Sequence, residues 1–517
     1  MLACVLSAAV RGVDAYMVRV EVDLASGLPC MNVVGLPESA VREGRERVTA
    51  ALANSGFKVP HMRITVNLAP ADVRKEGSAF DLPLGVGLIA ATGGVDAASL
   101  DDVCIVGELG LDGEVRPVRG VLPIALHCVQ AGVRTIIVPA GNGSEAAIVE
   151  RLDVRIADSL NEVVRHLRGA ERLPRAHARA AVAVPAGDGH GPDFEDVKGQ
   201  QHAKRALEVA AAGQHNVLMV GPPGSGKSML ARRLAGVLPP LSRQEALEVT
   251  AIYSVAGRLR TGSGLVDARP FRAPHHTIST AGLIGGSAWP RPGEASLAHH
   301  GVLFLDELPE FDRRTLEALR QPVEDGIVHI GRARSSVDFP ARFMLVAAMN
   351  PCPCGYYGVG DDRCICASGQ VQRYVARISG PLLDRFDIQI DVPALPEQHL
   401  LATTAAEPSA AIAVRVARAH ARQHVRFAKR SGLFANGQMD ARAVRLFCQT
   451  EARGQVLLRT AIRRLGLSAR GYHRILRIGR TIADLAGDAA IKPTHVAEAI
   501  QYRSMDRRVG AVAPMEA

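Results

Sequence analysis

The chain has 517 residues, which is too long for a single hydrophobic core and predicts two to four domains. Hydrophobic residues make up 47% of the sequence and charged residues 22%, a balance that excludes an intrinsically disordered protein. The formal net charge of +9 is compatible with an acidic partner such as nucleic acid, but arginine-rich composition produces the same balance in many enzymes.

The N-terminus is the apolar stretch MLACVLSAAV. It has no basic lead-in and is too short to span a bilayer, and the alternating sequence VRVEVDL soon follows, so we expect a buried strand over residues 2–10 rather than a signal peptide. No later window has eighteen uninterrupted apolar residues, so no membrane partner is expected. The nine cysteines have no disulfide-like spacing, which suits a reducing compartment and predicts a cytoplasmic protein.

Residues 1–168 alternate between strand-like and helical segments. The stretches MNVVGLP, RITVNLAP and RTIIVPA predict strands, because each is a short apolar and β-branched run. Residues 38–55 have an amphipathic helical pattern, and DLPLGVGLIAAT predicts a packed helix. We therefore expect one α/β domain over residues 1–168.

Two segments of this domain resemble the proteolytic domain of Lon-type proteases, which implies a ribosomal S5 domain 2-like fold. They are GELGLDGEVRPVRGVLPIALHCVQAGVRTIIVPAGN and RKEGSAFDLPLGVGLIAAT, the second of which resembles the segment with the nucleophilic serine. The resemblance puts Ala79 at the serine position, with Ser78 one residue earlier, and Leu122 at the lysine position. Because an unassisted serine is a poor nucleophile, we expect a binding or assembly domain that is inactive as a peptidase.

Three further regions follow. Residues 169–194 are rich in alanine, arginine, glycine and proline without a clear period, which predicts a linker. Residues 195–396 alternate between strands and helices again, and residues 397–517 are almost wholly helical in pattern. The expected fold class is therefore α/β multidomain, with a second α/β core and a helical C-terminal domain.

The core begins with a phosphate-binding loop. The apolar strand NVLMV enters it and the helical sequence SMLARRLAGVL leaves it, which is the context that this motif requires. Backbone N–H groups would surround the phosphates of ATP, Lys227 would neutralise the β- and γ-phosphates, and the Ser228 hydroxyl would bind Mg²⁺. The predicted nucleotide-binding residues of this loop are Gly221, Pro222, Pro223, Gly224, Ser225, Gly226, Lys227 and Ser228.

Two further strands are expected to end beside this loop. GVLFLDEL predicts a buried strand that ends in Asp306 and Glu307, and an acid at the carboxyl end of a parallel strand lies beside the phosphates. Asp306 would hold Mg²⁺ through water, and Glu307 would orient and polarise the attacking water. The strand RFMLVAAMN ends in Asn350, which would help to position that water or, equally, form a turn before Pro351.

The order of these motifs, followed by GPLLDRFD, resembles the AAA+ ATPases of the magnesium-chelatase branch. DFEDVKGQQHAKRALEVAAAGQHN resembles the segment that lines the adenine pocket there. The resemblance implies that Asn350 is sensor 1, Arg385 the arginine finger and Arg470, in SARGYHRILRIGRTIADL, the sensor 2 arginine. A finger that reaches the neighbouring subunit's γ-phosphate requires a ring, by family habit a hexamer. A salt bridge to Asp384 or Asp387 is the alternative reading of Arg385.

The whole arrangement closely resembles the YifB/ComM group of magnesium-chelatase-like AAA+ ATPases, over essentially the full chain. This resemblance implies a DNA-dependent hexameric motor that promotes branch migration in natural transformation and recombination, with single-stranded or branched DNA as its partner. Within it, residues 268–300 are an insertion that faces the ring pore, and VHIGRARSSVDFPARF is a hairpin with Arg332 and Arg334 near its tip. Arginines in a pore would follow phosphates without reading bases, whereas the alternative is a solvated hairpin tip.

Two other basic or metal-binding patterns stand out. Residues 411–430 contain six lysines and arginines and no acid on a helical period, which is compatible with DNA contact or with a helix packed on the core. NPCPCGYYGVGDDRCICASG has two Cys-x-Cys pairs, and each pair would offer two thiolates to one tetrahedral zinc. Structural zinc and four reduced thiols are equally compatible with this spacing. The candidate zinc ligands are Cys352, Cys354, Cys364 and Cys366.

Three other functions compete with the DNA motor. The first is the ATPase subunit of a magnesium chelatase, although the chain has an extra N-terminal domain and no Asp-x-Ser-x-Ser metal-adhesion motif. The second is an ATP-dependent protease, which Ala79 and Leu122 weaken. The third is a scaffold whose ATPase only controls assembly.

Overall fold

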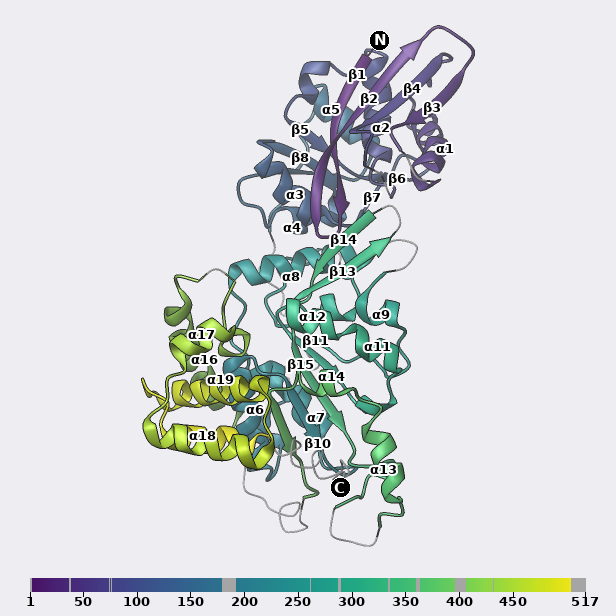
Figure 1. The fold of residues 1–517 in the computed structure, drawn as a ribbon. Coiled ribbons are helices and arrows are strands. Elements are labelled where there is room, and N and C mark those ends of the chain that lie inside the picture. Colours follow the sequence, from purple (N-terminus) through teal and green to yellow (C-terminus); the bar gives the residue numbers. More distant parts are fainter. Residues whose placement is uncertain are drawn as a thin grey trace.

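The computed structural model describes residues 2–36, 39–73, 75, 77–178, 192–260, 262–286, 290–332, 335–358, 363–395, 406–430 and 432–503. They form an N-terminal α/β domain, an α/β core with a parallel sheet, and a helical C-terminal region, which confirms the predicted fold class (Figure 1). Half of the predicted linker, residues 179–191, and the predicted boundary at residue 396 lie outside the described residues. Among the helices described, none combines the length and the apolar character that crossing a bilayer would need.

The N-terminal domain is built on a seven-stranded mixed sheet of order β3-β4-β2-β1-β5-β8-β9. β1 pairs antiparallel with β2 along the whole length of β1. Alternate residues of β2, such as Val18, Val20 and Val22, are buried because successive side chains of a strand point to opposite faces. The strands of the domain, including the small β6–β7 ribbon, are β1 Leu2–Arg11, β2 Asp14–Ala25, β3 Cys30–Val34, β4 Arg63–Ala69, β5 Val103–Ile105, β6 Glu108–Leu109, β7 Val115–Arg116, β8 Thr135–Pro139 and β9 Asp153–Ala157.

Helices cover this sheet. α2 is apolar after its first residue, Asp81, and is buried on nearly all sides. It lies so close to β2 that a Cβ atom on Gly87 would be 2.8 Å from Cγ2 of Val22. The predicted linker starts by packing on the same domain, since Leu173 is buried in its core. The helices are α1 Ser39–Asn54, α2 Asp81–Ala91, α3 Val121–Gln130, α4 Gly143–Ala146 and α5 Leu160–Leu167.

The central core has a five-stranded sheet of order β11-β12-β15-β10-β16, in which all neighbouring strands run parallel. β10 and β15 are fully buried, and as central strands of a parallel sheet they are apolar at every position rather than alternating. Because all five strands point the same way, the residues that follow β10, β12 and β15 meet at one edge of the sheet. The strands are β10 Val217–Val220, β11 Phe271–Arg272, β12 Val302–Leu305, β15 Met344–Met349 and β16 Ile388–Asp391.

Nine helices and one β-hairpin are described around this sheet. The hairpin joins β13 Ile327–Arg332 to β14 Ser335–Pro340 and comes just before β15, as the sequence pattern predicted. The helices are α6 Gln201–Gly213, α7 Lys227–Leu234, α8 Arg243–Ala256, α9 Thr280–Ile284, α10 Glu294–Leu297, α11 Arg313–Ala318, α12 Arg320–Asp325, α13 Ser368–Val375 and α14 Gly380–Leu383.

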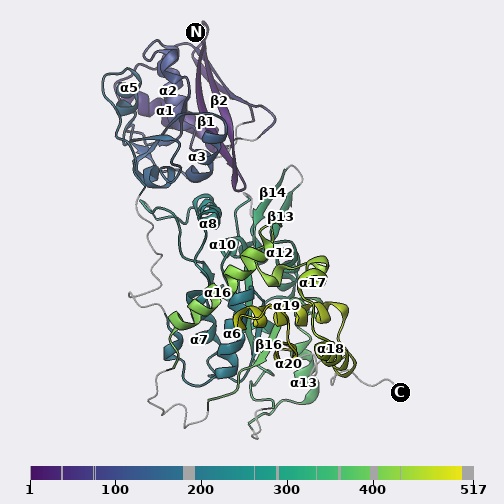
Figure 2. The same cartoon turned by 90° about the vertical axis from the view of Figure 1, so that its left-hand side faces the viewer.

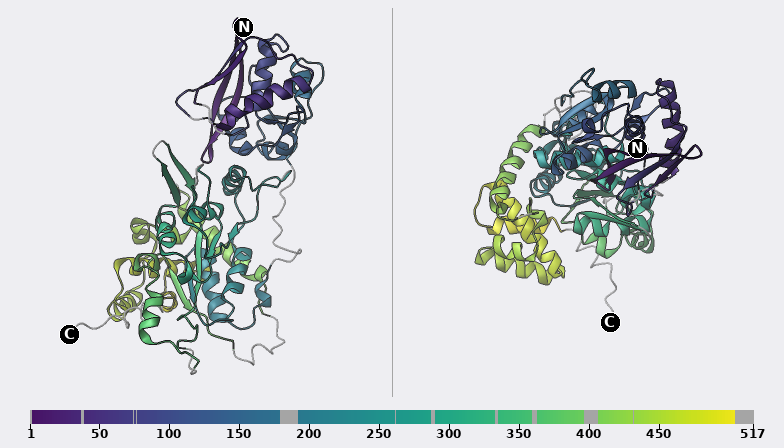
Figure 3. Two further views of the ribbon diagram at one scale, coloured as in Figure 1. Left: turned by 90° about the vertical axis from the view of Figure 1, so that its right-hand side faces the viewer. Right: turned by 90° about the horizontal axis from the view of Figure 1, so that it is seen from above.

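The C-terminal region is helical and lies to one side of the core (Figure 3). Its helices share one hydrophobic cluster with α6, α7 and the sheet, so the two parts have a common core. The basic stretch predicted over residues 411–430 falls on α16, which buries Ile412, Val416 and Phe427 against that cluster. The helices are α16 Ser409–Phe427, α17 Ala441–Phe447, α18 Ala452–Leu465, α19 Ala469–Ala486 and α20 Pro493–Gln501.

The N-terminal domain contacts the core at two places, α8 and the β13–β14 hairpin (Figure 2). At α8, Ala251 lies in a hydrophobic cluster of N-terminal-domain residues, and the Ser254 hydroxyl donates a hydrogen bond to the buried carboxylate of Glu145. At the hairpin, the Arg11 guanidinium donates to the backbone oxygen of Ser336 at 3.1 Å. The N-terminal domain is therefore docked on both elements.

Candidate nucleotide site, arginine cavity and cysteine cluster

The phosphate loop lies between β10 and α7, at the carboxyl edge of the core sheet. Gly224 and Gly226 have φ angles of 74° and 89°, a left-handed conformation that glycine adopts without steric cost. A Cβ atom on Gly221 would be 2.1 Å from the backbone oxygen of Val392, so no larger residue fits there. The glycines thus permit the tight turn that directs backbone N–H groups toward a bound anion.

Lys227 is the first residue of α7 and is 7% exposed. Its ammonium group donates to the backbone oxygens of Gly221 and Pro222, both at 2.8 Å. Burial lowers the pKa of Lys227, and the nearby carboxylate of Asp306 opposes that shift. A cation held inside the loop that closes around it is suited to neutralise phosphate charge.

Ser228 and Asp306 come together as a pair of oxygen donors. The Ser228 hydroxyl donates to Oδ2 of Asp306 at 2.5 Å, although the two residues lie 78 positions apart. Hydroxyl and carboxylate oxygens are ligands that Mg²⁺ accepts, and Mg²⁺ binds proteins through one or two such groups besides phosphates and waters. The donor set therefore fits a nucleotide-bound Mg²⁺.

Glu307 follows Asp306 at the end of β12 with a φ of 53°, which turns the chain sharply. Its side chain is 57% exposed, and Oε2 lies 3.4 Å from Nδ1 of His276. His276 belongs to the segment predicted to face a ring pore, and its imidazole packs against that of His275 with ring centroids 4.1 Å apart. The sequence analysis placed these histidines in the pore-facing insertion and did not foresee the contact with Glu307.

Asn350 follows β15 and lies at the same carboxyl edge of the core sheet as the phosphate loop. Its Oδ1 accepts a hydrogen bond of 3.3 Å from the ammonium group of Lys227. The three strand ends therefore bring together the predicted residues of the loop, Asp306 and Asn350. This convergence supports a role for Asn350 beside the phosphates rather than in a turn alone.

Arg385 lies away from this edge, just after α14. Its guanidinium donates to the backbone oxygen of Pro381 at 2.8 Å and to the carboxylate of Glu324 on α12. The predicted alternatives, Asp384 and Asp387, instead contact the guanidinium of Arg474, at 3.7 and 3.4 Å. The ion pair of Arg385 thus has a different partner from the one that the sequence suggested.

Arg470 and Arg385 line the same cavity of about 550 Å³. The described residues that line it include none from the phosphate loop, but they include Arg474 and Arg477, one and two turns further along α19. Nη1 of Arg474 is buried and has no hydrogen-bond partner among the described residues. This donor has an ion-pair partner in Asp384 at 3.7 Å but no hydrogen bond, so an anionic group in the cavity would be able to accept one from it. Sequence reasoning missed Arg474, although its i+4 spacing from Arg470 was a usable signal.

Only some of the residues predicted to contact DNA lie in the described part of the chain. Arg332 is the last residue of β13, and its side chain and the whole of Arg334 lie outside the described part of the chain. Two of the six cations in the α16 region are neutralised by acids from elsewhere: Arg415 pairs with Glu407 and Glu208, and Arg426 pairs with Asp484. The basic face of α16 is therefore smaller than the sequence indicated.

The peptidase-like positions of the N-terminal domain carry no serine–lysine pair. Leu122 is fully buried, and its backbone N–H donates to Glu145 at 2.8 Å. The Ser78 hydroxyl donates to the carboxylate of Glu108, while the ammonium group of the buried Lys75 donates to backbone oxygens. This geometry favours a domain that binds or assembles.

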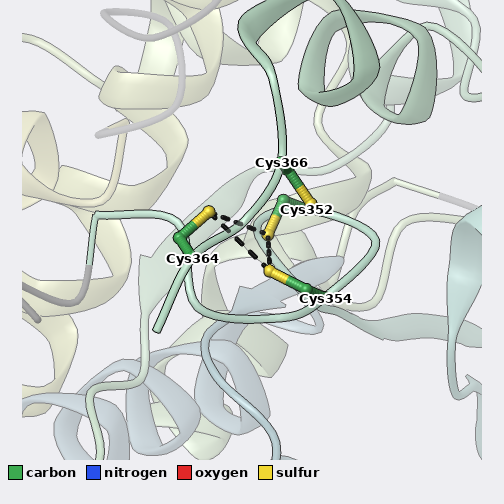
Figure 4. Close-up of side chains that lie close together, drawn as sticks. All are labelled: Cys352, Cys354, Cys364 and Cys366. Carbon is green, nitrogen blue, oxygen red and sulfur yellow. Dashed lines mark hydrogen bonds between the residues drawn. The ribbon is translucent and has the colours of Figure 1, made fainter. Parts of the chain in front are cut away.

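The four clustered cysteines converge on one point from the loop after β15 and the segment before α13 (Figure 4). The Sγ atom of Cys352 lies 3.3 Å from that of Cys354 and 3.9 Å from that of Cys364, and the latter two lie 3.7 Å apart. All four sulfurs, including that of Cys366, lie within 4.8 Å of one another. Each distance exceeds the length of about 2.05 Å that a disulfide requires.

The chain matches three family descriptions in succession. Residues 20–142 match "Subunit ChlI of Mg-chelatase", residues 193–400 match "Magnesium chelatase, subunit ChlI", and residues 406–503 match "Magnesium chelatase, subunit ChlI C-terminal". The limits of these matches parallel the three parts of the fold.

Similar proteins cover almost the full length. The chain is 46% identical over 508 residues to the competence protein ComM of Haemophilus influenzae, with 98% of each chain covered. It is 44% identical over 508 residues to the protein YifB of Salmonella typhimurium, again with 98% of each chain covered. A partial similarity, 28% identity over 185 residues, links 31% of the chain to 33% of Lon protease 2 of Bacillus subtilis.

Proposed function

This chain belongs to the YifB/ComM family of magnesium-chelatase-like AAA+ ATPases, and from that premise we propose that it is a ring-forming motor that hydrolyses ATP to act on DNA. The observation that carries the proposal is the division of the predicted site residues into two groups. Lys227, Ser228, Asp306 and Asn350 meet at one edge of the core sheet, whereas Arg385 lines a separate cavity.

In the first group each side chain has a definite task. The loop and Lys227 hold the phosphates of ATP, and Ser228 and Asp306 hold Mg²⁺, which supplies charge neutralisation on the β- and γ-phosphates. Glu307 accepts the proton of the attacking water, and Asn350 orients that water. The contact with His276 keeps the carboxylate of Glu307 near this edge.

The second group acts on the neighbouring subunit. Arg385 and Arg470 share one cationic cavity, so both would reach the nucleotide of the next chain as arginine finger and sensor 2. Such a site is complete only between two subunits, which supports a closed ring with a heterologous interface, by family precedent a hexamer.

The proposed motor acts on single-stranded or branched DNA, and its proposed activity is branch migration in natural transformation and recombination. The similarity to a competence protein and the β13–β14 hairpin beside the predicted pore segment support this proposal. Arg332 and Arg334 would contact phosphates there. The division of the chain into an N-terminal domain (1–168), linker (169–194), core (195–396) and C-terminal domain (397–517), and its cytoplasmic location, belong to the same proposal.

The proposed function also includes a structural zinc ion on the four clustered cysteines. Zinc binds thiolate sulfurs at about 2.3 Å in a tetrahedron, whose edges are then about 3.8 Å long. The three S···S distances of 3.3, 3.7 and 3.9 Å are close to that edge. Four sulfur ligands leave no open position, so the ion would be structural rather than catalytic.

The alternative function is that of an ATPase subunit of a magnesium chelatase, which the three family matches favour. An ATP-dependent protease is not favoured, because Leu122 occupies the position where a lysine would activate a serine. The DNA motor and the chelatase subunit differ in the partner that stimulates ATP hydrolysis, whereas a scaffold would remodel neither DNA nor a chelatase substrate.

The test measures ATP hydrolysis and strand displacement with four-way junctions, forked duplexes and blunt duplexes. We expect stimulation by the junction or the fork, and displacement that Glu307→Gln abolishes. If no DNA stimulates hydrolysis and none is remodelled, the motor function is wrong. Stimulation by a protoporphyrin-binding partner would favour the chelatase, and degradation of casein would favour the protease.

A further inference from the structure

The cysteine cluster lies directly beside the nucleotide site. Cys352 is two residues beyond Asn350, and the loop between the first cysteine pair and Gly358 turns back toward the phosphate loop. Gly355, with a φ of 89°, is the point of contact: a Cβ atom there would be 2.5 Å from Cδ of Pro223 and 3.8 Å from Cγ of Asn350. The backbone of the cysteine loop therefore rests on both the phosphate loop and sensor 1.

The loop is held in this position through the sulfur of Cys352. The backbone N–H groups of Gly355 and Tyr357 donate to its Sγ atom at 3.2 and 3.3 Å. Cys352 is fully buried, so its sulfur is shielded from solvent. A thiolate bound to a metal ion accepts such hydrogen bonds more strongly than a neutral thiol does, so the ion and the turn at Gly355 stabilise each other.

The charge of the surroundings fits a tetrathiolate centre. Four thiolates and one Zn²⁺ have a net charge of −2. Arg373 and Arg377, on α13 and just after it, line a cavity together with Cys354 and Cys366, but Glu310 lines the same cavity and pairs with Arg377 at 3.0 Å. Of the two arginines, Arg373 therefore offsets part of the charge of the cluster. The second cysteine pair also leads directly into α13, whose Tyr374 is buried in the core.

We propose that the zinc ion on these four cysteines is a structural support of the nucleotide pocket, so that a chain without the ion binds nucleotide more weakly. This inference rests on the zinc site of the proposed function. The ion joins the end of β15 to the start of α13 and thereby fixes the turn at Gly355, which in turn supports Pro223 and Asn350. Without the ion, this turn keeps the hydrogen bonds of Gly355 and Tyr357 to the Cys352 sulfur and the backbone bond from Gly355 N–H to the Cys352 oxygen at 3.0 Å, but loses the link to the second cysteine pair.

The experiment measures metal content and nucleotide affinity on the same full-length samples. Metal is determined by mass spectrometry after gel filtration, and affinity by fluorescence titration with a labelled ADP in constant excess Mg²⁺. The variants are Cys364→Ser, which removes one ligand of the less buried pair, and Cys30→Ser, which removes an exposed thiol of the N-terminal domain. We expect one zinc per chain in the wild type and in Cys30→Ser, and its loss with about tenfold weaker ADP binding in Cys364→Ser.

A second pair of variants tests the support without touching a cysteine. Gly355→Ala and Gly358→Ala both place a side chain at a positive φ, 89° and 76°, but only Gly355 faces Pro223, since Gly358 has open space around its Cβ position. We expect weaker ADP binding with retained zinc in Gly355→Ala, and wild-type affinity in Gly358→Ala. Circular dichroism establishes that each variant is folded, and removal and return of zinc with a zinc-selective chelator tests reversibility in the wild type.

The possible results test the zinc site, its support of the nucleotide pocket and the motor function separately. A wild-type chain without zinc, or with iron, contradicts the zinc site itself. Zinc that is present and lost in Cys364→Ser, with ADP affinity unchanged there and in Gly355→Ala, overturns the structural support but leaves the zinc site standing. A missing response to DNA contradicts only the motor function, because ADP binding is measured without DNA.

Discussion

Glu307 and Asp306 are adjacent carboxylates with different surroundings. Asp306 accepts a hydrogen bond from Ser228 and faces Lys227, a position that suits the proposed metal ligand. Glu307 is more than half exposed, and its Oε2 lies 3.4 Å from Nδ1 of His276, so its carboxylate is accessible to the proposed attacking water. The proposed function thus assigns metal binding to Asp306 and hydrolysis to Glu307.

A Glu307→Gln substitution is expected to slow ATP hydrolysis by about 10² to 10⁴-fold, because the amide cannot accept the proton of the attacking water. Nucleotide affinity is expected to stay within about threefold of the wild type, since no phosphate contact is removed. Single-turnover hydrolysis and ADP titration measure the two effects separately. Glu310→Gln, which removes a nearby carboxylate paired with Arg377, is the matched control and should hydrolyse ATP normally. Equal loss in both variants would contradict the assignment.

At the scale of elements, α12 connects the β13–β14 hairpin to Arg385. Glu324 lies in the last turn of α12, directly before β13, and its carboxylate holds the guanidinium of Arg385. A movement of the hairpin would therefore change the position of the residue that holds the proposed arginine finger.

Glu324→Gln should raise hydrolysis in the absence of DNA by up to about fivefold, because an ion pair with one exposed partner is worth at most about 1 kcal/mol. Stimulation by DNA should shrink by the same factor. Steady-state ATPase assays with and without DNA measure both, and Asp325→Asn, the neighbouring acid on the same turn, is the control. A variant with unchanged basal rate would show that the ion pair does not restrain Arg385.

A second element-scale prediction concerns the junction of α8, β12 and the segment before β15. His299 is 2% exposed there. Its Nδ1 accepts from the backbone N–H of Arg342 at 3.0 Å, so its proton lies on Nε2, 3.2 Å from a carboxylate oxygen of Glu248. Burial lowers the pKa of His299 from 6.5 to about 4, with Glu248 opposing and His300 and Arg342 adding to the shift.

Because the folded pKa lies below the unfolded one, the contribution of His299 to stability is present above pH 6.5 and lost as the pH falls toward 4. We expect the free energy of unfolding to decrease by about 2 kcal/mol between pH 7 and pH 5 from this residue. Urea unfolding at the two pH values measures the change. His299→Asn, which keeps an acceptor for Arg342 but does not titrate, should reduce the pH dependence, whereas the exposed His61→Asn should not. An unchanged pH dependence in His299→Asn would refute the shifted pKa.

Elements with a strong local signal were predictable from the sequence. The helix expected over residues 38–55 is α1 Ser39–Asn54, and the hairpin before β15 has its expected position, because periodicity and turn residues are local properties. Partners from distant segments were not predictable. Glu324 was not foreseen as the partner of Arg385, nor Glu307 as that of His276, since such contacts depend on how the elements pack.

At the scale of the whole molecule, the predicted site residues of one chain form two groups that lie apart, one at the carboxyl edge of the core sheet and one in the arginine cavity. The order of the strands along the sheet made the meeting of Asp306 and Asn350 with the phosphate loop predictable. The shared cavity of Arg385 and Arg470 was not predictable, because it depends on the docking of α19 against the core.

Two inactive variants should restore each other if the two groups act between chains. Lys227→Ala destroys the pocket, and Arg385→Ala destroys the finger. In a 1:1 mixture about a quarter of the interfaces of a ring would pair an intact pocket with an intact finger, so we expect about a quarter of the wild-type ATPase rate. A mixture of Lys227→Ala with Asp306→Ala, both in the pocket, should stay inactive. Equal rates in the two mixtures would contradict action between subunits.

The docking of the N-terminal domain has a consequence for the integrity of the chain. Besides the peptide connection, the domain is attached through Ala251 in the shared hydrophobic cluster and through the Ser254–Glu145 hydrogen bond. A chain cut by a protease between residues 178 and 192 would then yield two fragments that elute together. The same property would allow the two pieces to be produced from separate genes and to reassemble, with the covalent connection serving mainly to keep their stoichiometry equal.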